Sequence, residues 1–334
     1  MNDRLTYSSP GRHQEWPQVL PLLMLLLAAV AMIPVSGLQT PSSDADLRGL
    51  SLPMSSLAFI LLLTQSGVLL RSTLPEKASP PLKAFAATCG IGIPFFYVLG
   101  ILDNMHSPFL SLTGAALMLS SWCFQLSPRT YPLMWAVASG LTAGMACSIS
   151  PGCFSGALAL LFFTLFQKEP SWNIKAQCTL AWIAALLCGL VPALNGGGFL
   201  PLYGQQMFDP EFVRAGVVAV SEHISIWTWL FAGFGLLIAI LQRQKIILGL
   251  IVPFFILRLL LAGFSSLQVW EIDSTLLLPF AWLTAYGLLR LLRGIEQGVR
   301  RVHPERAKKI PVIATCVFLA AFLLKIVDLY SSAS

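Results

Sequence analysis

Long apolar runs alternate with short polar loops along almost the whole chain. Apolar runs of about 18 or more residues with almost no charge are typical of helices that cross a membrane. The pattern therefore predicts an all-α, polytopic integral membrane protein whose residues 1–334 form a single transmembrane domain. Eleven membrane-spanning helices are expected, at residues 17–37, 53–70, 84–102, 108–126, 132–149, 152–166, 176–194, 224–241, 246–264, 276–292 and 310–330.

The least certain boundary lies at Ser150-Pro151-Gly152, between two of these runs. Proline and glycine interrupt a helix here, because proline lacks a backbone N–H and glycine has wide conformational freedom. The flanking runs are interpreted either as two short helices or as one re-entrant element.

The basic residues predict the orientation of the chain. Lysine and arginine near a membrane span are retained on the cytoplasmic side. With the N-terminus in the cytoplasm and the C-terminus outside, all but four of the 21 lysines and arginines lie in inner segments. The four exceptions are Arg48, Arg214, Arg258 and Lys325. The opposite orientation would invert this bias, so an N-in, C-out topology is favoured.

Three extramembrane segments stand out in this topology. The outer loops cover residues 38–54 and 195–223, and a basic cytoplasmic loop covers residues 290–309. In the second outer loop, Asp209 and Pro210 have the chemistry of an N-cap and a first helical residue, which predicts a short amphipathic helix over 210–220. The basic loop is expected to lie at the headgroup surface and to bind anionic lipids electrostatically.

Composition supports a membrane environment. The chain is 56% hydrophobic and only 11% charged, whereas a soluble domain carries about 25% charged residues. The net charge of +6 follows from membrane orientation, and we expect no nucleic-acid partner. The first apolar run is too long for a signal peptide and is expected to be retained as a helix. The expected location is the bacterial cytoplasmic (inner) membrane.

The seven cysteines lie in or beside the predicted spans, at positions 89, 123, 147, 153, 178, 188 and 316. Their spacing matches neither a zinc site nor a redox motif. We therefore expect small, apolar packing residues and no disulfide bonds.

Asp44 and Asp46 are the first candidates for chemistry, because they follow the first predicted span on the outer side. Carboxylates at a membrane rim can bind a divalent cation such as Mg²⁺ or Mn²⁺, or act as a base on an acceptor hydroxyl. The alternative is a solvated loop in which acids are simply tolerated.

Arg258 lies within the apolar run IVPFFILRLLLAGF. A charged group at membrane depth costs about 2.5–3.5 kcal/mol on insertion scales, so such a residue indicates function by default. The planar guanidinium suits phosphate, to which it can donate paired hydrogen bonds. The alternatives are extension to the outer interface and pairing with a carboxylate on another helix.

The remaining candidates lie at the outer ends of spans. Arg214, Glu222 and His223 of the second outer loop are candidate substrate-binding residues. Together with His106, Glu222 and His223 could bind zinc or move protons, although scattered histidines are usually ordinary loop residues. In the last span, Lys325 and Asp328 are three residues apart on one helical face and are expected to pair.

Two stretches resemble the GT-C fold membrane glycosyltransferases, in particular the protein O-mannosyltransferase branch. The segment LLLPFAWLTAYGLLRLLRGIEQGVRR followed by IPVIATCVFLAAFLL resembles their C-terminal spans, and residues 129–166 resemble an earlier helix with a Gly-Leu-x-x-Gly motif. The resemblance implies an acidic catalytic or metal-binding residue in the first outer loop, which matches Asp44 and Asp46. It also implies a polyprenyl-phosphate sugar as donor and a basic residue for its phosphate, which matches Arg258. The first outer loop is shorter here than in that superfamily.

The leading expectation is therefore transfer of a sugar from a polyprenyl-phosphate donor on the outer face. A small-molecule or lipid transporter or flippase is the first alternative, although internal repeats and polar residues at mid-bilayer are scarce. The second alternative is a non-catalytic structural subunit of a membrane complex.

Overall fold

The computed structural model describes residues 45–74, 78–102, 108–126, 132–166, 172–195, 226–262 and 274–333, together with Pro210, Glu211, Arg214 and Val218. Over these residues the protein is helical and has no strand, which confirms the predicted all-α class. The first predicted span and most of the second outer loop lie outside the described residues.

The helices follow the apolar runs closely. Their bounds are α2 (Ala45–Ser72), α3 (Pro80–Leu102), α4 (Pro108–Leu126), α5 (Pro132–Ile149), the 3-10 turn η1 (Pro151–Cys153), α6 (Phe154–Phe166), α7 (Trp172–Asn195), α9 (Ile226–Leu241), the π-helical turn η3 (Ile247–Ile251), α10 (Val252–Ala262), α11 (Ser274–Val302), α12 (Pro304–Ala307) and α13 (Ile310–Ala333). Proline is the first residue of α3, α4, α5 and α12. Its fixed φ suits the first helical position, where its missing N–H costs no intrahelical bond.

Three helices are long and apolar enough to cross a membrane, in the segments Pro132–Ile149, Trp172–Val191 and Pro304–Asp328. Five shorter apolar helices accompany them in the described part of the chain: Leu57–Arg71, Leu112–Leu126, Phe154–Phe166, Ile226–Leu241 and Ile247–Leu261. Large apolar side chains are exposed on many of these helices. Exposed apolar surface on this scale fits contact with lipid rather than water.

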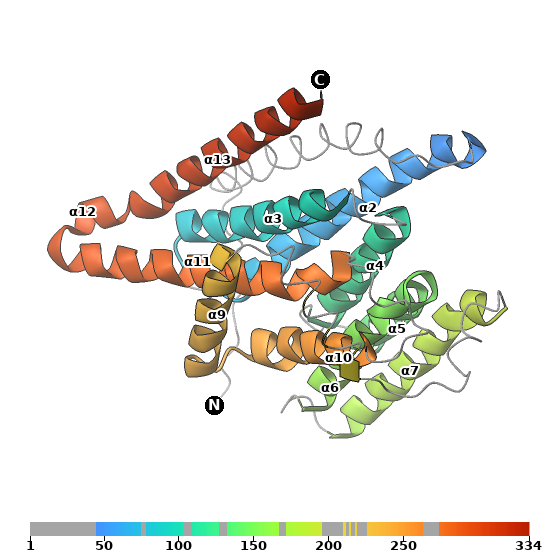
Figure 1. The fold of residues 1–334 in the computed structure, drawn as a ribbon. Coiled ribbons are helices and arrows are strands. Elements are labelled where there is room, and N and C mark those ends of the chain that lie inside the picture. The colour runs from blue at the N-terminus through green and yellow to red at the C-terminus, as the bar shows by residue number, and fades with distance from the viewer. Residues whose placement is uncertain are drawn as a thin grey trace.

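Neighbouring helices pack in a continuous series. α5 lies between α4 and α7, α2 packs against α3 and α4, and α11 packs against α3 and α9. In Figure 1, α11 leads through α12 into α13, which runs back beside α3, while α5, α6, α7 and α10 gather at the other end of the molecule. The interior between them is filled by buried side chains that form one hydrophobic cluster.

Glycines bring three helix pairs into close contact. A Cβ atom added to Gly90 of α3 would lie 2.8 Å from Cα of Gly67 of α2, and one added to Gly189 of α7 would lie 2.9 Å from Cα of Gly144 of α5. A Cβ added to Gly287 of α11 would lie 3.2 Å from N of Gly235 of α9. Small residues at such contacts let backbones approach closely, which is how helices associate where the hydrophobic effect is absent.

Serine side chains add hydrogen bonds that join α5 to α4 and to α7. Ser121 Oγ of α4 donates to Ser139 O of α5 at 2.8 Å, and Ser139 Oγ donates back to Ser121 O at 3.0 Å. Trp182 Nε1 of α7 donates to Ser139 Oγ at 3.1 Å, and Ser148 Oγ of α5 donates to Gly189 O at 2.8 Å. These bonds fix the register of α4, α5 and α7.

Two glycines of α9 provide a matched test of this packing. At Gly235 an added Cβ would collide with the carbonyl oxygen of Leu283, whereas at Gly233 it would meet nothing within 4 Å. We expect Gly235→Ala to destabilise the protein by about 1–3 kcal/mol, because the two helices must separate. Gly233→Ala should be neutral or stabilising, because alanine favours a helix by about 0.5–1 kcal/mol over glycine. Thermal unfolding of both variants in detergent measures the difference, and equal melting temperatures would contradict the close α9–α11 contact.

Two segments that were predicted to lie outside the membrane are largely helical. Residues 45–54 of the first outer loop belong to α2, which begins at Ala45. Within residues 290–309, α11 continues to Val302 and α12 follows at Pro304. The charges of this segment lie along an amphipathic helix, in which Glu296 is buried beneath the exposed Arg300 at 3.7 Å.

The interruption at Ser150-Pro151-Gly152 is a break between two helices. α5 ends at Ile149, Ser150 is non-helical, and the 3-10 turn η1 leads into α6. Two backbone hydrogen bonds hold this break. Ser150 N donates to Ala146 O at 2.9 Å, and Cys153 N donates to Ser150 O at 3.0 Å. These two runs therefore form two helices, α5 and α6, that are joined by the η1 turn.

Candidate functional site

Arg258 is the most unusual side chain of the interior. It lies on α10, among apolar neighbours in sequence, and only 2% of its surface is exposed. This burial excludes the interpretation that Arg258 extends to the surface of the protein. A guanidinium stays protonated in proteins, so a full positive charge lies inside the helical assembly. Arg258 also has a further interaction partner beyond the contacts given below.

The guanidinium of Arg258 lies against the break between α5 and α6. A Cβ atom added to Gly152 would lie 2.7 Å from Cζ, 2.8 Å from Nη2 and 3.1 Å from Nη1 of Arg258. Only glycine leaves this space, so Gly152 allows the planar group to pack on the backbone of η1. Since η1 follows the C-terminal end of α5, whose carbonyl groups carry partial negative charge, a cation is favoured at this place.

The turn beneath the guanidinium is held in place locally. Ser155 Oγ donates to Gly152 O at 2.7 Å, and Ser155 is fully buried. A Cβ added to Gly114 of α4 would lie 3.0 Å from Cβ of Ser150 and 3.3 Å from Sγ of Cys153. The η1 turn therefore packs directly on α4, which positions Gly152 opposite α10.

An aromatic cluster lies one turn along α10 from Arg258. Phe254 packs edge-on against Trp122 of α4 at 5.4 Å between ring centroids, and Trp122 packs edge-on against Trp282 of α11 at 6.3 Å. Trp122 Nε1 approaches Gly156 O of α6 at 3.4 Å. The indole N–H of Trp282 is buried and has no hydrogen-bond partner in the described part of the chain. These buried rings make the surroundings of α10 apolar one helical turn from Arg258, and a charge attracts an anion more strongly in apolar surroundings than in water.

The other predicted site residues are not brought together with Arg258 by the described structure. Asp46 belongs to the first turn of α2, and Asp44 lies outside the described residues, as do Glu222, His223 and His106. Arg214 is helical and exposed. The expected cation site on Asp44 and Asp46 therefore stays a prediction. Among the described residues, no group of three or more His, Cys, Asp and Glu side chains could hold a metal ion.

Two simpler predictions are confirmed. Lys325 Nζ of α13 donates to Asp328 Oδ2 at 2.7 Å, with both side chains exposed, so this pair is a surface contact of small energy. Cys89, Cys147, Cys153 and Cys178 are buried, as expected of small packing residues. The packing interpretation does not extend to Cys188 and Cys316, which are exposed.

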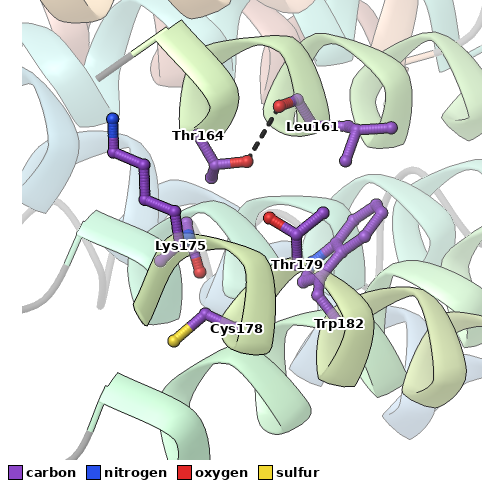
Figure 2. A pocket seen from close by; sticks show the side chains of 7 residues that line it. Leu161, Thr164, Lys175, Cys178, Thr179 and Trp182 are labelled. Carbon is purple, nitrogen blue, oxygen red and sulfur yellow. Dashed lines mark hydrogen bonds between the residues drawn. The ribbon is translucent and has the colours of Figure 1, made fainter. Parts of the chain in front are cut away.

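Sequence reasoning missed Gly152 as a partner of Arg258 and missed a second polar region formed by Gln125, Thr164, Lys175 and Thr179. The proline and glycine that interrupt the apolar run were a usable signal for Gly152. The polar region gave no signal in the sequence, because its residues come from three different helices (Figure 2).

No protein-family model, no curated protein and no solved structure matches this chain.

Proposed function

We propose that this protein is a multi-pass membrane protein that binds the phosphate of a polyprenyl-phosphate sugar and transfers the sugar to an acceptor on the outer face of the bacterial cytoplasmic membrane. The observation on which the proposal rests is the buried Arg258 guanidinium packed on the backbone of Gly152. A charged residue within an apolar helix is costly and indicates a functional site by default, and a planar fork of donors suits phosphate. The resemblance to GT-C glycosyltransferases supplies the donor class.

The proposed topology has eleven spans, with the N-terminus in the cytoplasm and the C-terminus outside. The described helix ends support it. Gln125 near the end of α4, Thr164 near the end of α6 and Lys175 near the start of α7 line one hollow, so these ends lie on one side of the assembly. That side contains Lys175, in agreement with retention of basic residues in the cytoplasm. The break at η1 lies at the other ends of α5 and α6. In the proposed topology, Arg258, which packs on η1, therefore belongs to the outer half of the membrane.

In the proposed reaction, Arg258 holds the donor phosphate while an acceptor hydroxyl attacks the anomeric carbon of the sugar. A carboxylate of Asp44 or Asp46 takes the hydroxyl proton, a bond forms between the acceptor oxygen and the anomeric carbon, and the carbon–oxygen bond to phosphate breaks. Polyprenyl phosphate leaves with the bonding electrons, and its added negative charge is stabilised by the guanidinium. A divalent cation on Asp44 and Asp46 would supply further charge stabilisation.

The test is sugar transfer by the full-length protein in proteoliposomes loaded with labelled polyprenyl-phosphate hexoses. We expect the double variant Asp44→Asn, Asp46→Asn to lose at least about 100-fold in rate, because positioned bases contribute about 10²–10⁴-fold. The control is Asp328→Asn, which removes an acid that pairs at the surface with Lys325 and should leave the rate unchanged. Transfer that survives the double change contradicts the assignment of the base. Lipid translocation without transfer would instead identify a flippase.

A further inference from the structure

A second buried guanidinium lies where α9 ends beside α11. Only 8% of the surface of Arg290 is exposed, and its Cζ atom lies 4.9 Å from the centre of the Tyr286 ring. The Nε atom of Arg290 is enclosed and has no hydrogen-bond partner in the described part of the chain. A guanidinium stays protonated in proteins, and an aromatic ring attracts its charge through the ring face. Arg290 is therefore a buried charge that keeps an unused hydrogen-bond donor.

The helices around Arg290 provide no acid that neutralises this charge. The helices α3, α4, α9 and α10 pack on α11 and contain no aspartate or glutamate. The one acid of α2 is Asp46, in its first turn, and the one acid of α11 is Glu296, whose carboxylate lies 3.7 Å from Arg300. The acids of α12 and α13 are paired with neighbouring lysines. An anion from outside these helices is therefore needed to balance the buried charge.

The turn that follows α9 brings further polar groups to Arg290. Tyr286 Oη donates to Gln242 Oε1 at 3.4 Å, which is longer than the about 2.5–3.0 Å that is usual for a hydroxyl donor. Arg293 and Gln244 also lie near the Tyr286 hydroxyl and act on it electrostatically. Gln242 is exposed, so the turn lies at the surface of the protein. A weakly bonded hydroxyl and a second arginine therefore accompany the buried guanidinium.

We propose that Tyr286, Arg290 and Arg293 bind a phosphate group where α9 ends beside α11. Two guanidinium groups and a hydroxyl supply the donors that phosphate accepts, and arginine can donate to it in pairs. The phosphate of an anionic lipid headgroup and a free phosphate ion share this chemistry. Ile240 and Leu241 at the end of α9 are 54% and 73% exposed, which gives lipid chains an apolar surface beside the site.

This site is separate from the proposed donor site at Arg258. In the proposed topology it faces the cytoplasm, because it lies between two of the basic inner segments. It does not depend on sugar transfer, so its test is independent of that activity.

The test is thermal unfolding of the full-length protein in detergent, titrated with a short-chain phosphatidylglycerol, the matching diacylglycerol or inorganic phosphate. A ligand that binds the folded state raises the melting temperature. We expect phosphatidylglycerol to stabilise the wild-type protein and diacylglycerol, which lacks the phosphate, to have no effect. In Arg290→Met the half-saturating concentration should rise at least about tenfold, because hydrogen bonds between charged groups are strong.

Tyr286→Phe tests the site without removing the buried charge, because it keeps the ring that packs on Arg290 and loses only the hydroxyl. Its half-saturating concentration should rise about fivefold. Arg290→Lys keeps the charge but lacks the planar fork of donors, so it should bind more weakly than the wild type and more tightly than Arg290→Met. A titration that is unchanged in Tyr286→Phe and in Arg290→Met would overturn the site.

Arg301→Gln is the matched control, because Arg301 is exposed on the same helix and its loss removes the same charge. It lies about 16 Å along the helix axis from Arg290 at about 1.5 Å per residue. This distance exceeds the Debye length of about 8 Å at physiological salt, so the titration should be unchanged. An equal loss of binding in Arg301→Gln and Arg290→Met would overturn the site, because it would show general attraction to the basic segment 290–309.

The three ligands distinguish the source of the phosphate. Stabilisation by phosphatidylglycerol at concentrations where inorganic phosphate has no effect would identify a lipid headgroup. Equal stabilisation by inorganic phosphate, lost in Arg290→Met, would support the site and identify a free phosphate ion as its ligand. Equal stabilisation by diacylglycerol would overturn the proposal, because binding would then need no phosphate.

Discussion

Gly144→Leu is expected to abolish the native packing of α5 on α7. A single Cβ at this position already collides with the carbonyl oxygen of Leu186 and lies 2.9 Å from Cα of Gly189. Both obstacles are backbone atoms, so no side-chain rotation relieves the contact and the helices must move apart. Helix separation would also break the bond from Ser148 Oγ to Gly189 O. We expect the free energy of unfolding to fall by at least about 3 kcal/mol, which is the upper end of the usual cost of overpacking.

The neighbouring position gives a matched control for this prediction. Met145 is 43% exposed on the same helix, so Met145→Leu introduces the same side chain on the outer face of α5. Size-exclusion chromatography after heating in detergent measures the fraction that stays monodisperse. We expect Met145→Leu to match the wild-type protein and Gly144→Leu to aggregate well below that temperature. A Gly144→Leu protein as stable as Met145→Leu would contradict the glycine contact between α5 and α7.

Arg258→Met is expected to reduce sugar transfer by at least about 100-fold, which is the usual effect of removing one preorganised group that stabilises developing charge. Arg258→Lys should recover part of the rate only, because an ammonium is a point charge and lacks the planar fork of donors. The control is Arg300→Met, since Arg300 is an exposed residue that contacts Glu296 at 3.7 Å and lies far along the chain from the proposed site.

Stability distinguishes this role from a structural one. Removing one partner of a structural buried ion pair costs about 3–5 kcal/mol, because the other charge stays buried without compensation. If the main role of Arg258 is to bind phosphate, Arg258→Met should lose transfer and lose much less than this in its free energy of unfolding. A strongly destabilised Arg258→Met protein would identify Arg258 as an internal ion-pair partner.

The helices at residues 108–126 and 132–149 were predictable to the residue, because proline opens each of them and the apolar runs end in polar segments. The helix across residues 290–302 was not. A dense run of arginines resembles a solvated loop when only hydropathy is considered, yet its spacing buries Glu296 and keeps Arg300 exposed on an amphipathic helix. The arginines therefore led to the interpretation of this segment as a loop, although the helical periodicity was present in the sequence.

The candidate site was only half predictable. Arg258 is conspicuous from sequence, because a charge inside an apolar run is expensive. Gly152 gives no such signal, because glycine also serves in turns and caps, and only the packing of α10 on the η1 turn shows why a side chain is excluded there. The hollow at Lys175 depends on the meeting of three helix ends, which is tertiary information that no local pattern contains.

The proposed function depends most directly on binding of a polyprenyl phosphate at Arg258. The most direct measurement is a native mass spectrum of the full-length protein released from nanodiscs, recorded for the wild type and for Arg258→Met. We predict a bound mass equal to a polyprenyl phosphate or its sugar conjugate in the wild type, and its loss in the variant. A wild-type spectrum with only ordinary phospholipid, or with a tightly held second protein, would contradict the account and identify a structural subunit.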